Sequence, residues 1–135
     1  MKRFTLLVSV LLVTSCHLGD HRPLNYRAGI TTVGNHVCII APVSDDEVMT
    51  SLTISEVGNN LNVTERHFTL EKGLTLSAST CVPDFGFSFE SGRSYISSIH
   101  TTYRNRKDSV PNGRNYSVTF SLWKENGELK SVDVN

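Results

Sequence analysis

Three cysteines, Cys16, Cys38 and Cys81, are the most reactive side chains in this sequence of 135 residues. A thiol can be acylated, oxidised to a disulfide or used as a metal ligand, and its neighbours and its compartment decide which of these happens. Cys16 stands directly after a short apolar run, whereas the other two cysteines lie about 40 residues apart in the body of the chain. We therefore expect Cys16 to have a role of its own.

Residues 1–15 predict a lipoprotein signal peptide. Two basic residues are followed by a run at positions 4–13 that is apolar except for one threonine and one serine. A membrane-spanning helix needs roughly 20 apolar residues, so this run has only the length of a signal-peptide core. It leads into Val13-Thr14-Ser15-Cys16, which resembles a lipobox, with small residues before the cysteine that becomes the first residue of the mature chain. The alternative is an ordinary signal peptide with an incidental cysteine.

A lipid on Cys16 would hold the chain on a membrane. One acyl chain binds reversibly, whereas two or more anchor a protein stably at about 0.8 kcal/mol per buried methylene. The resemblance to lipoproteins implies three acyl chains on Cys16, and this covalent lipid is the one non-protein group that we expect. His17 rather than an aspartate follows the cysteine. By analogy with enterobacterial sorting, this favours the outer membrane, with the protein facing the periplasm.

After cleavage, we expect residues 16–27 to form a polar lipidated tether and residues 28–135 to form a single domain. The mature chain carries 11 basic and 13 acidic side chains, so its formal charge is 11 − 13 = −2. This near-neutral balance gives no support for nucleic-acid binding, which needs a basic footprint. No second long apolar stretch is present, so the lipid is the expected membrane attachment.

Cys38 and Cys81 predict a disulfide, because the exported chain would reach an oxidising compartment. The bond would close a loop of roughly 40 residues and contribute about 3–4 kcal/mol. Two separate buried thiols are the alternative. A metal site at His36-Val37-Cys38 lacks paired ligands at zinc-finger spacing, so we expect no metal and no other cofactor.

The pattern of apolar residues predicts an all-β chain, since short alternating runs are separated by turn residues about every ten positions. Gly34-Asn35 and Asn126-Gly127 are signals for two-residue hairpins. Phe85, Phe87 and Phe89 are spaced two apart and would share one face of an extended strand. About seven to eight strands with one disulfide favour a small immunoglobulin-like β-sandwich.

Tyr95 opens one of the longest predicted strands and follows Gly92 by three residues. This arrangement is similar to the tyrosine corner of Greek-key sandwiches, in which the phenol bonds to nearby backbone. The alternative is an aromatic residue that simply packs within the strand. In both cases Tyr95 is structural.

Catalytic motifs are absent from the sequence. It contains no nucleophile elbow, no His-Glu-x-x-His, no phosphate-binding glycine loop and no dinucleotide fingerprint. The five histidines are scattered, and the acidic run Asp45-Asp46-Glu47 predicts a solvated loop. No general acid is paired with a base at a recognisable spacing. We therefore expect no enzyme, no catalytic residue and no small-molecule substrate.

The segment 104–115 would connect two long strands and project from one end of the sandwich. Such loops carry recognition in immunoglobulin-like domains, because the scaffold fixes their ends and leaves their sequence free. A basic patch here would steer an acidic protein partner onto the domain, and a solvated hairpin loop is the alternative. The candidate partner-binding residues are Arg104, Arg106, Lys107 and Arg114.

The whole pattern resembles a known family. The motifs that carry the resemblance are the lipobox, Asn35-His36-Val37-Cys38-Ile39, the stretch from Cys81 to Phe89, Gly92-Arg93-Ser94-Tyr95 and the strand from Tyr116 to Trp123. Over nearly its whole length the chain resembles small enterobacterial periplasmic lipoproteins assigned to type VI secretion immunity. The resemblance implies a tethered protein that captures a toxic effector in the periplasm and neutralises it by binding.

Two other functions stay open. Ser91-Gly92-x-x-Tyr95 is similar to the Ser-Gly-x-x-Tyr signature of membrane-bound inhibitors of c-type lysozyme, whose serine enters the lysozyme cleft. The second motif of those inhibitors, a lysine-glycine pair after the following tyrosine, is absent, because Arg104 follows Tyr103. The other possibility is a structural lipoprotein of the cell envelope.

Overall fold

The fold is known from a computed structural model, which describes residues 24–106 and 110–134. The predicted signal peptide, Cys16 and Lys107 lie outside these residues. No helix in the described part of the chain is long and apolar enough to cross a membrane.

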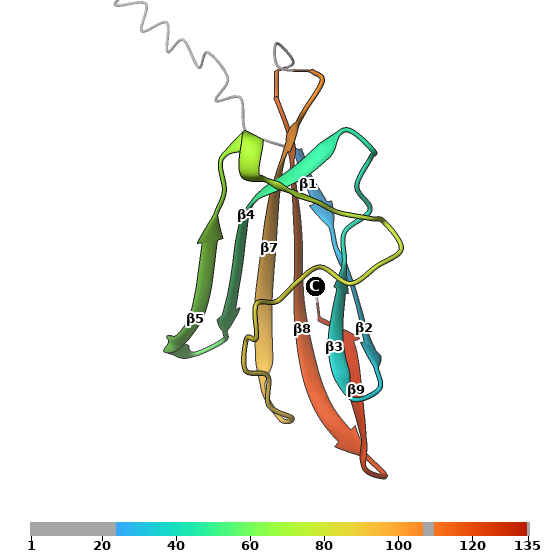
Figure 1. The fold of residues 1–135 in the computed structure, drawn as a ribbon. Helices are drawn as coiled ribbons and strands as arrows, with labels where there is room; N and C mark the ends of the chain where they lie inside the picture. Colours follow the sequence, from blue (N-terminus) through green and yellow to red (C-terminus); the bar gives the residue numbers. More distant parts are fainter. Residues whose placement is uncertain (1–23, 107–109, 135) are drawn as a thin grey trace, which may run out of the picture.

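The described residues form nine β-strands and one short 3₁₀ helix (Figure 1). Their bounds are β1 (Leu24–Arg27), β2 (Gly29–Val33), β3 (His36–Ile40), β4 (Glu47–Glu56), β5 (Asn59–His67), η1 (Leu70–Lys72), β6 (Leu74–Thr75), β7 (Ser94–Tyr103), β8 (Arg114–Glu125) and β9 (Glu128–Asp133). The prediction of a small all-β sandwich is confirmed, with nine strands in place of seven to eight.

The two layers of the sandwich are unequal. Seven strands form one sheet in the order β1-β8-β7-β4-β5, in which β6 also pairs with β4 and β9 also pairs with β8. The other layer consists of the β2–β3 hairpin and the long coil between β6 and β7, which crosses in front of the large sheet (Figure 1). Alternation along the long strands produces the core, because every second residue of β7 and β8 is buried against this second layer.

Residues 24–27, which the sequence places in the tether, form strand β1. They pair in parallel with β8, and Tyr26 packs on the ring of Tyr116 at 5.7 Å between centroids. Four residues are too few to show a hydrophobic period, so only the pairing with β8 reveals this strand.

The segment from Phe85 to Phe89 is coil rather than an extended strand. Phe85 has a left-handed φ of 54° and Gly86 follows at 74°, while Asp84 Oδ1 accepts a hydrogen bond from Gly86 N at 3.0 Å. This turn separates the rings: Phe87 and Phe89 pack edge-on against Tyr95, but Phe85 is 38% exposed and lies 6.0 Å from Phe68. The prediction that the three phenylalanine rings share one face of a strand is therefore wrong.

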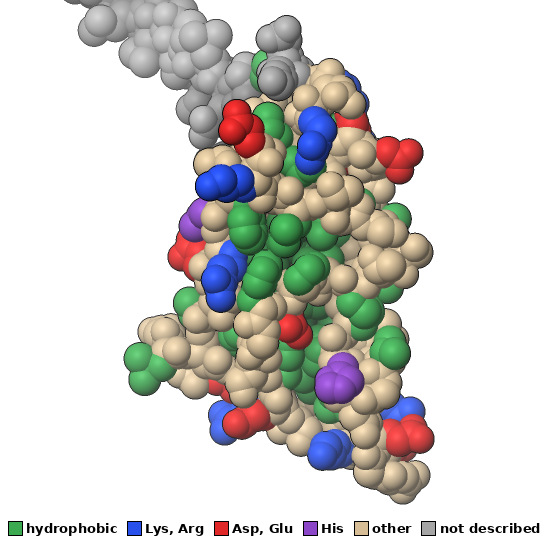
Figure 2. Space-filling view, viewed as in Figure 1, with side chains coloured by type: hydrophobic (Ala, Val, Ile, Leu, Met, Phe, Trp, Pro, Cys, Tyr) green, Lys and Arg blue, Asp and Glu red, His purple; other side chains and the backbone are tan. Residues whose placement is uncertain are grey.

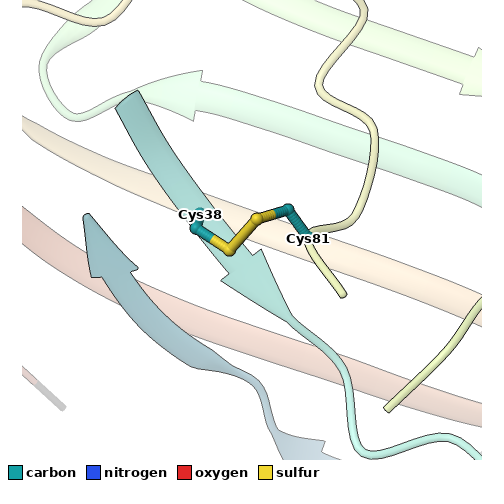
Figure 3. The surroundings of a disulfide bond; sticks show 2 residues. All are labelled: Cys38 and Cys81. Atoms are coloured by element: carbon teal, nitrogen blue, oxygen red, sulfur yellow. A yellow bond between two sulfur atoms is a disulfide. The ribbon is translucent and has the colours of Figure 1, made fainter. Parts of the chain in front are cut away.

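The predicted disulfide between Cys38 and Cys81 is present and joins β3 to the long coil (Figure 3). The next residue, Val82, donates its backbone N–H to Ile39 O at 2.7 Å, and its side chain is buried in the core. The disulfide thus holds the long coil between β6 and β7 against β3, although this coil forms no strand pairing.

Both predicted two-residue hairpins form, with positive φ at Gly34, Asn35, Asn126 and Gly127, as a type I′ turn requires. The tyrosine corner is also confirmed: Tyr95 Oη accepts a hydrogen bond from Glu90 N at 2.7 Å, and the ring is fully buried.

Candidate binding site

The acidic run and the basic loop lie side by side at one end of the sandwich. β4 and β7 are antiparallel, so Glu47 at the start of β4 pairs with Tyr103 at the end of β7. Two backbone hydrogen bonds extend this contact: Arg104 N donates to Asp46 O at 2.6 Å, and Tyr103 N donates to Asn112 O at 2.8 Å. The acidic run and the basic loop, whose nearest residues Glu47 and Arg104 are 57 positions apart in the sequence, therefore form one structure.

Glu47 is the buried centre of this end, with 1% of its surface exposed. Its carboxylate accepts hydrogen bonds from Thr101 Oγ1 at 2.7 Å, Tyr116 Oη at 2.7 Å and Ser44 Oγ at 2.8 Å. Burial alone would raise the pKa of Glu47, but these donors and the Ser44 backbone N–H outweigh it and lower the pKa. A charged carboxylate is thus held in the interior by satisfied hydrogen bonds.

Arg114 covers this carboxylate from the solvent side. Its Nη1 lies 4.0 Å from Glu47 Oε2, and its Nε donates to Tyr103 Oη at 2.9 Å. The guanidinium also lies over the ring of Tyr26, at 4.9 Å from the centroid. The neighbouring hydroxyls of Tyr116 and Tyr103 raise the pKa of Arg114, so it remains cationic.

Arg106 forms the exposed part of the site. Its guanidinium lies 3.7 Å from the centroid of the Tyr103 ring and binds Asp46 through two hydrogen bonds, of 2.7 and 3.1 Å. The hydrogen bond from Arg106 lowers the pKa of Asp46, and the same contact raises that of Arg106. We name Tyr26, Tyr103, Arg106 and Arg114 the arginine–tyrosine cluster.

The loop reaches this position because residue 113 is a glycine. A Cβ atom added at Gly113 would lie 1.8 Å from the backbone oxygen of Thr101, a distance that no side chain tolerates. Gly113 is buried, and Arg114 N next to it donates to Thr101 Oγ1 at 3.2 Å. This close approach holds the start of β8 against the end of β7.

The predicted binding residues have different surroundings. Arg106 and Arg114 meet in the cluster, Arg104 is exposed and held at its backbone, and Lys107 lies outside the described residues. Beside these three arginines stand the three carboxylates Asp45, Asp46 and Glu47, so the formal charges of the described groups at this end sum to zero.

The prediction of a solvated acidic loop is wrong for Glu47. It failed because the sequence around Glu47 contains no sign of its donors Thr101 and Tyr116, which lie 54 and 69 residues away. The sequence likewise gives no sign that Tyr103 and Tyr26 contact the guanidinium groups of Arg106 and Arg114. In the part of the chain that is described, no group of three His, Cys, Asp or Glu side chains could hold a metal ion.

One family model matches the chain, over residues 25–125, and its description is a domain of unknown function, DUF7480. The match includes the whole arginine–tyrosine cluster and its buried glutamate. Neither the curated proteins nor the solved structures contain a match. Because the model covers most of the sequence, the chain belongs to the DUF7480 family.

Proposed function

We propose that this chain is a membrane-anchored lipoprotein that binds a toxic effector protein in the periplasm and neutralises it, with the arginine–tyrosine cluster as part of its binding surface. The observation that carries the proposal is the fixed position of Arg106. Its side chain is 47% exposed, yet one carboxylate and one aromatic ring hold its guanidinium in place.

A side chain fixed before binding loses less conformational entropy when a partner docks. Arginine and tyrosine are also enriched among the residues that contribute most to protein–protein affinity. The cluster offers two exposed residues of these types, Arg106 and Tyr26, beside the partly exposed Arg114. Because the neighbouring carboxylates balance these cations, we expect recognition by local hydrogen bonds and stacking rather than by a broad basic field.

The site also fits a lipid anchor on Cys16. β1 begins at Leu24, which pairs with Arg114, so the described chain begins at the same end as the cluster (Figure 1). Seven residues lie between Cys16 and Leu24, so this segment spans at most about 25–30 Å. An anchored protein would keep the cluster within this reach of the membrane and raise its local concentration there.

The test is to produce the full-length chain together with secreted proteins encoded in the same genome, and to measure both rescue of growth and direct binding. We expect one of these proteins to be toxic in the periplasm and to be neutralised. The proposal is overturned if a folded, membrane-bound chain neither rescues growth from any of them nor binds one.

A pair of variants tests whether the cluster is the binding surface. Arg106→Ala should weaken binding at least about tenfold, the effect typical of a central arginine. Arg66→Ala is the matched control, because Arg66 also stacks on an aromatic ring, at 5.0 Å from the centroid of Phe85, but on another part of the molecule. Equal binding by both variants would place the effector surface elsewhere.

The anchor has its own test. Cys16→Ser should abolish incorporation of labelled fatty acid and release the chain from the membrane fraction. If the Cys16→Ser chain stays in the membrane with its label, the lipid is not on Cys16.

One observation favours inhibition of c-type lysozyme as a second candidate. Ser91 is exposed in a turn before β7, where Gly92 has a φ of 83° and donates its N–H to Leu122 O at 2.7 Å. This turn lies at the opposite end of the sheet from the cluster (Figure 1). Inhibition that is lost in Ser91→Arg but kept in Arg106→Ala would support this function in place of the first.

A further inference from the structure

A polar cavity of about 290 Å³ lies at the end of the sandwich opposite the arginine–tyrosine cluster. It is formed by the β4–β5 hairpin and the coil that precedes β7, two segments that meet at the same end of the molecule (Figure 1). All the residues that line it are polar or charged: Glu56, Asn59, Asn62, Ser88, Glu90 and Arg93. A ligand in this cavity must therefore exchange hydrogen bonds with its walls.

The irregular start of β5 supplies one wall. Glu56 pairs with Asn59, but residues 60–62 have no partner opposite them on β4. The backbone of this stretch donates instead to the side-chain oxygen of Asn59 at 3.1 Å, and Asn62 Nδ2 donates to Ser88 O at 3.4 Å. Irregularities in a strand ladder redirect side chains and are common beside binding sites. Here the irregularity places two asparagines at the cavity.

The tyrosine corner fixes the other wall. Glu90 N donates to Tyr95 Oη at 2.7 Å, and Gly92 N donates to Leu122 O at 2.7 Å. The coil of residues 88–93 contributes the other three polar or charged side chains that are not on the hairpin. Although it is not a strand, this coil is held to the sheet at two points.

Glu56 supplies a buried acceptor to the cavity, since only 5% of its side chain is exposed. Its Oε2 accepts a hydrogen bond from Asn59 Nδ2 at 2.6 Å, whereas within the described residues its Oε1 has only an ion pair, with Arg93 Nε at 3.6 Å. The same Nε lies 3.8 Å from Glu90 Oε2. Both distances are too long for hydrogen bonds, so these charged groups keep unused donors and acceptors. The space-filling view shows acidic and basic side chains beside one another at the lower end of the molecule (Figure 2).

We propose that this cavity binds a neutral sugar ring, whose hydroxyl groups bridge Glu56 and Arg93. A hydroxyl both donates and accepts, so a sugar can donate to Glu56 Oε1 and accept from the guanidinium. An anion would be repelled by two carboxylates, and a metal ion would be repelled by the guanidinium between them. A single ammonium group would fill little of the 290 Å³, whereas this volume, at the lower limit of ordinary ligand sites, suits one ring with its hydroxyls.

A second cavity, of about 470 Å³, has Glu90 as a wall in common with the first. Phe89 and Leu129 give it an apolar surface, and Asn35 and Lys124 are among its polar residues. The C–H face of a sugar ring can pack on such an apolar surface and exclude water from it. A linear glycan would therefore continue from the first cavity past Glu90 into the second.

Saturation-transfer NMR tests the proposal on the full-length chain, purified in a detergent without a sugar headgroup. The probes are glucose, mannose and N-acetylglucosamine, each as the single sugar and as a linear trisaccharide. We expect at least one single sugar to bind, and its trisaccharide to bind at least about tenfold more tightly because it also occupies the second cavity. Equal affinities of the two forms would support a free sugar as the ligand. If none of the six probes binds to a chain whose Cys38–Cys81 disulfide is intact, the proposal is overturned.

A pair of variants locates the binding. Arg93→Gln should weaken it about tenfold, the effect of losing a hydrogen bond to a charged group, and should leave the fold intact because this side chain is 57% exposed. Arg66→Gln is the matched control, since Arg66 is exposed on β5 but does not line either cavity. Equal binding by the two variants would overturn the assignment of the sugar to this cavity.

The charge of the ligand is tested with glucosamine in its ammonium form. We expect it to bind no more tightly than N-acetylglucosamine, because its cation would lie beside the guanidinium of Arg93. Binding at least about tenfold tighter than that of every neutral sugar would overturn the proposal and assign the cavity to an ammonium group.

Discussion

Asp46 and Glu47 are neighbours in the sequence, yet each holds an arginine in different surroundings. Asp46 binds Arg106 at the surface, where 47% of the arginine side chain is exposed. Glu47 is buried and lies 4.0 Å from Arg114, with hydroxyl donors from Ser44, Thr101 and Tyr116 around it. The same end of the sandwich thus has a buried half around Glu47 that supports the loop and an exposed half around Arg106 that faces solvent.

The difference shows which half controls stability. An exposed ion pair is weakened by water and salt, and it contributes little to the free energy of unfolding. A buried carboxylate is costly to remove from its donors, because hydroxyl groups are then left without an acceptor in the interior. We therefore expect changes around Glu47 to affect folding and changes around Asp46 to affect binding.

The largest effect should come from Glu47→Ala. It removes the acceptor of Tyr116 Oη and Thr101 Oγ1 and leaves a cavity, so the free energy of unfolding should fall by about 2–4 kcal/mol. Asp46→Ala is the matched control and should leave the unfolding midpoint nearly unchanged. Urea titration of both variants measures the contrast, and equal losses would show that burial does not separate the two acids.

Gly113→Ala should rank next. The added methyl would collide with the backbone of Thr101, and the shift that relieves the clash should cost about 2–3 kcal/mol. Asn112→Ala, one residue earlier and exposed, is the control. If thermal unfolding shows the two variants to be equally stable, then the loop moves freely and does not support the cluster.

Much of the fold could be predicted from sequence because its signals are local. The hairpins at Gly34-Asn35 and Asn126-Gly127 and the corner at Tyr95 each depend on a few adjacent residues. The disulfide could also be predicted, since two cysteines remain after Cys16.

The rest depends on contacts that local pattern does not encode. Phe85 keeps the spacing of a strand residue but lies in a turn with positive φ. The burial of Glu47 depends on Thr101 and Tyr116, which are brought to it by the antiparallel order of β4, β7 and β8. Arg106 and Arg114 could be named from the sequence, but their ring and carboxylate partners could not.

The pH dependence of the free energy of unfolding should also distinguish Glu47 from Asp46. The pKa of Glu47 is lowered from 4.5 in the folded state, so its contribution is complete above that value and is lost as the pH falls through the folded pKa. Glu47→Gln should therefore flatten the loss of stability below about pH 4.5. Asp46→Asn should change it less, because solvent screens the exposed pair.

Burial lowers the pKa of the half-buried His100 from 6.5 in the folded state. The unfolded chain therefore binds a proton at His100 more readily, and this residue destabilises the fold as the pH falls below 6.5. The two acid variants are for this reason compared with each other at each pH, by unfolding in urea. An equal flattening in both variants would contradict the contrast.

The smallest effect on stability should come from Arg106→Ala, and this variant separates the two halves most clearly. Arg106 contacts Asp46 and the face of Tyr103 at the surface, whereas Arg114 still covers Glu47 when Arg106 is absent. We expect an unfolding midpoint that is unchanged within error, together with the loss of partner binding proposed above. The unfolding midpoint and the partner binding of Arg106→Ala should be measured on the same preparation. A large loss of stability would place Arg106 in the supporting half. Unchanged stability with weakened binding would mean that the fold fixes this arginine in place while depending on it very little.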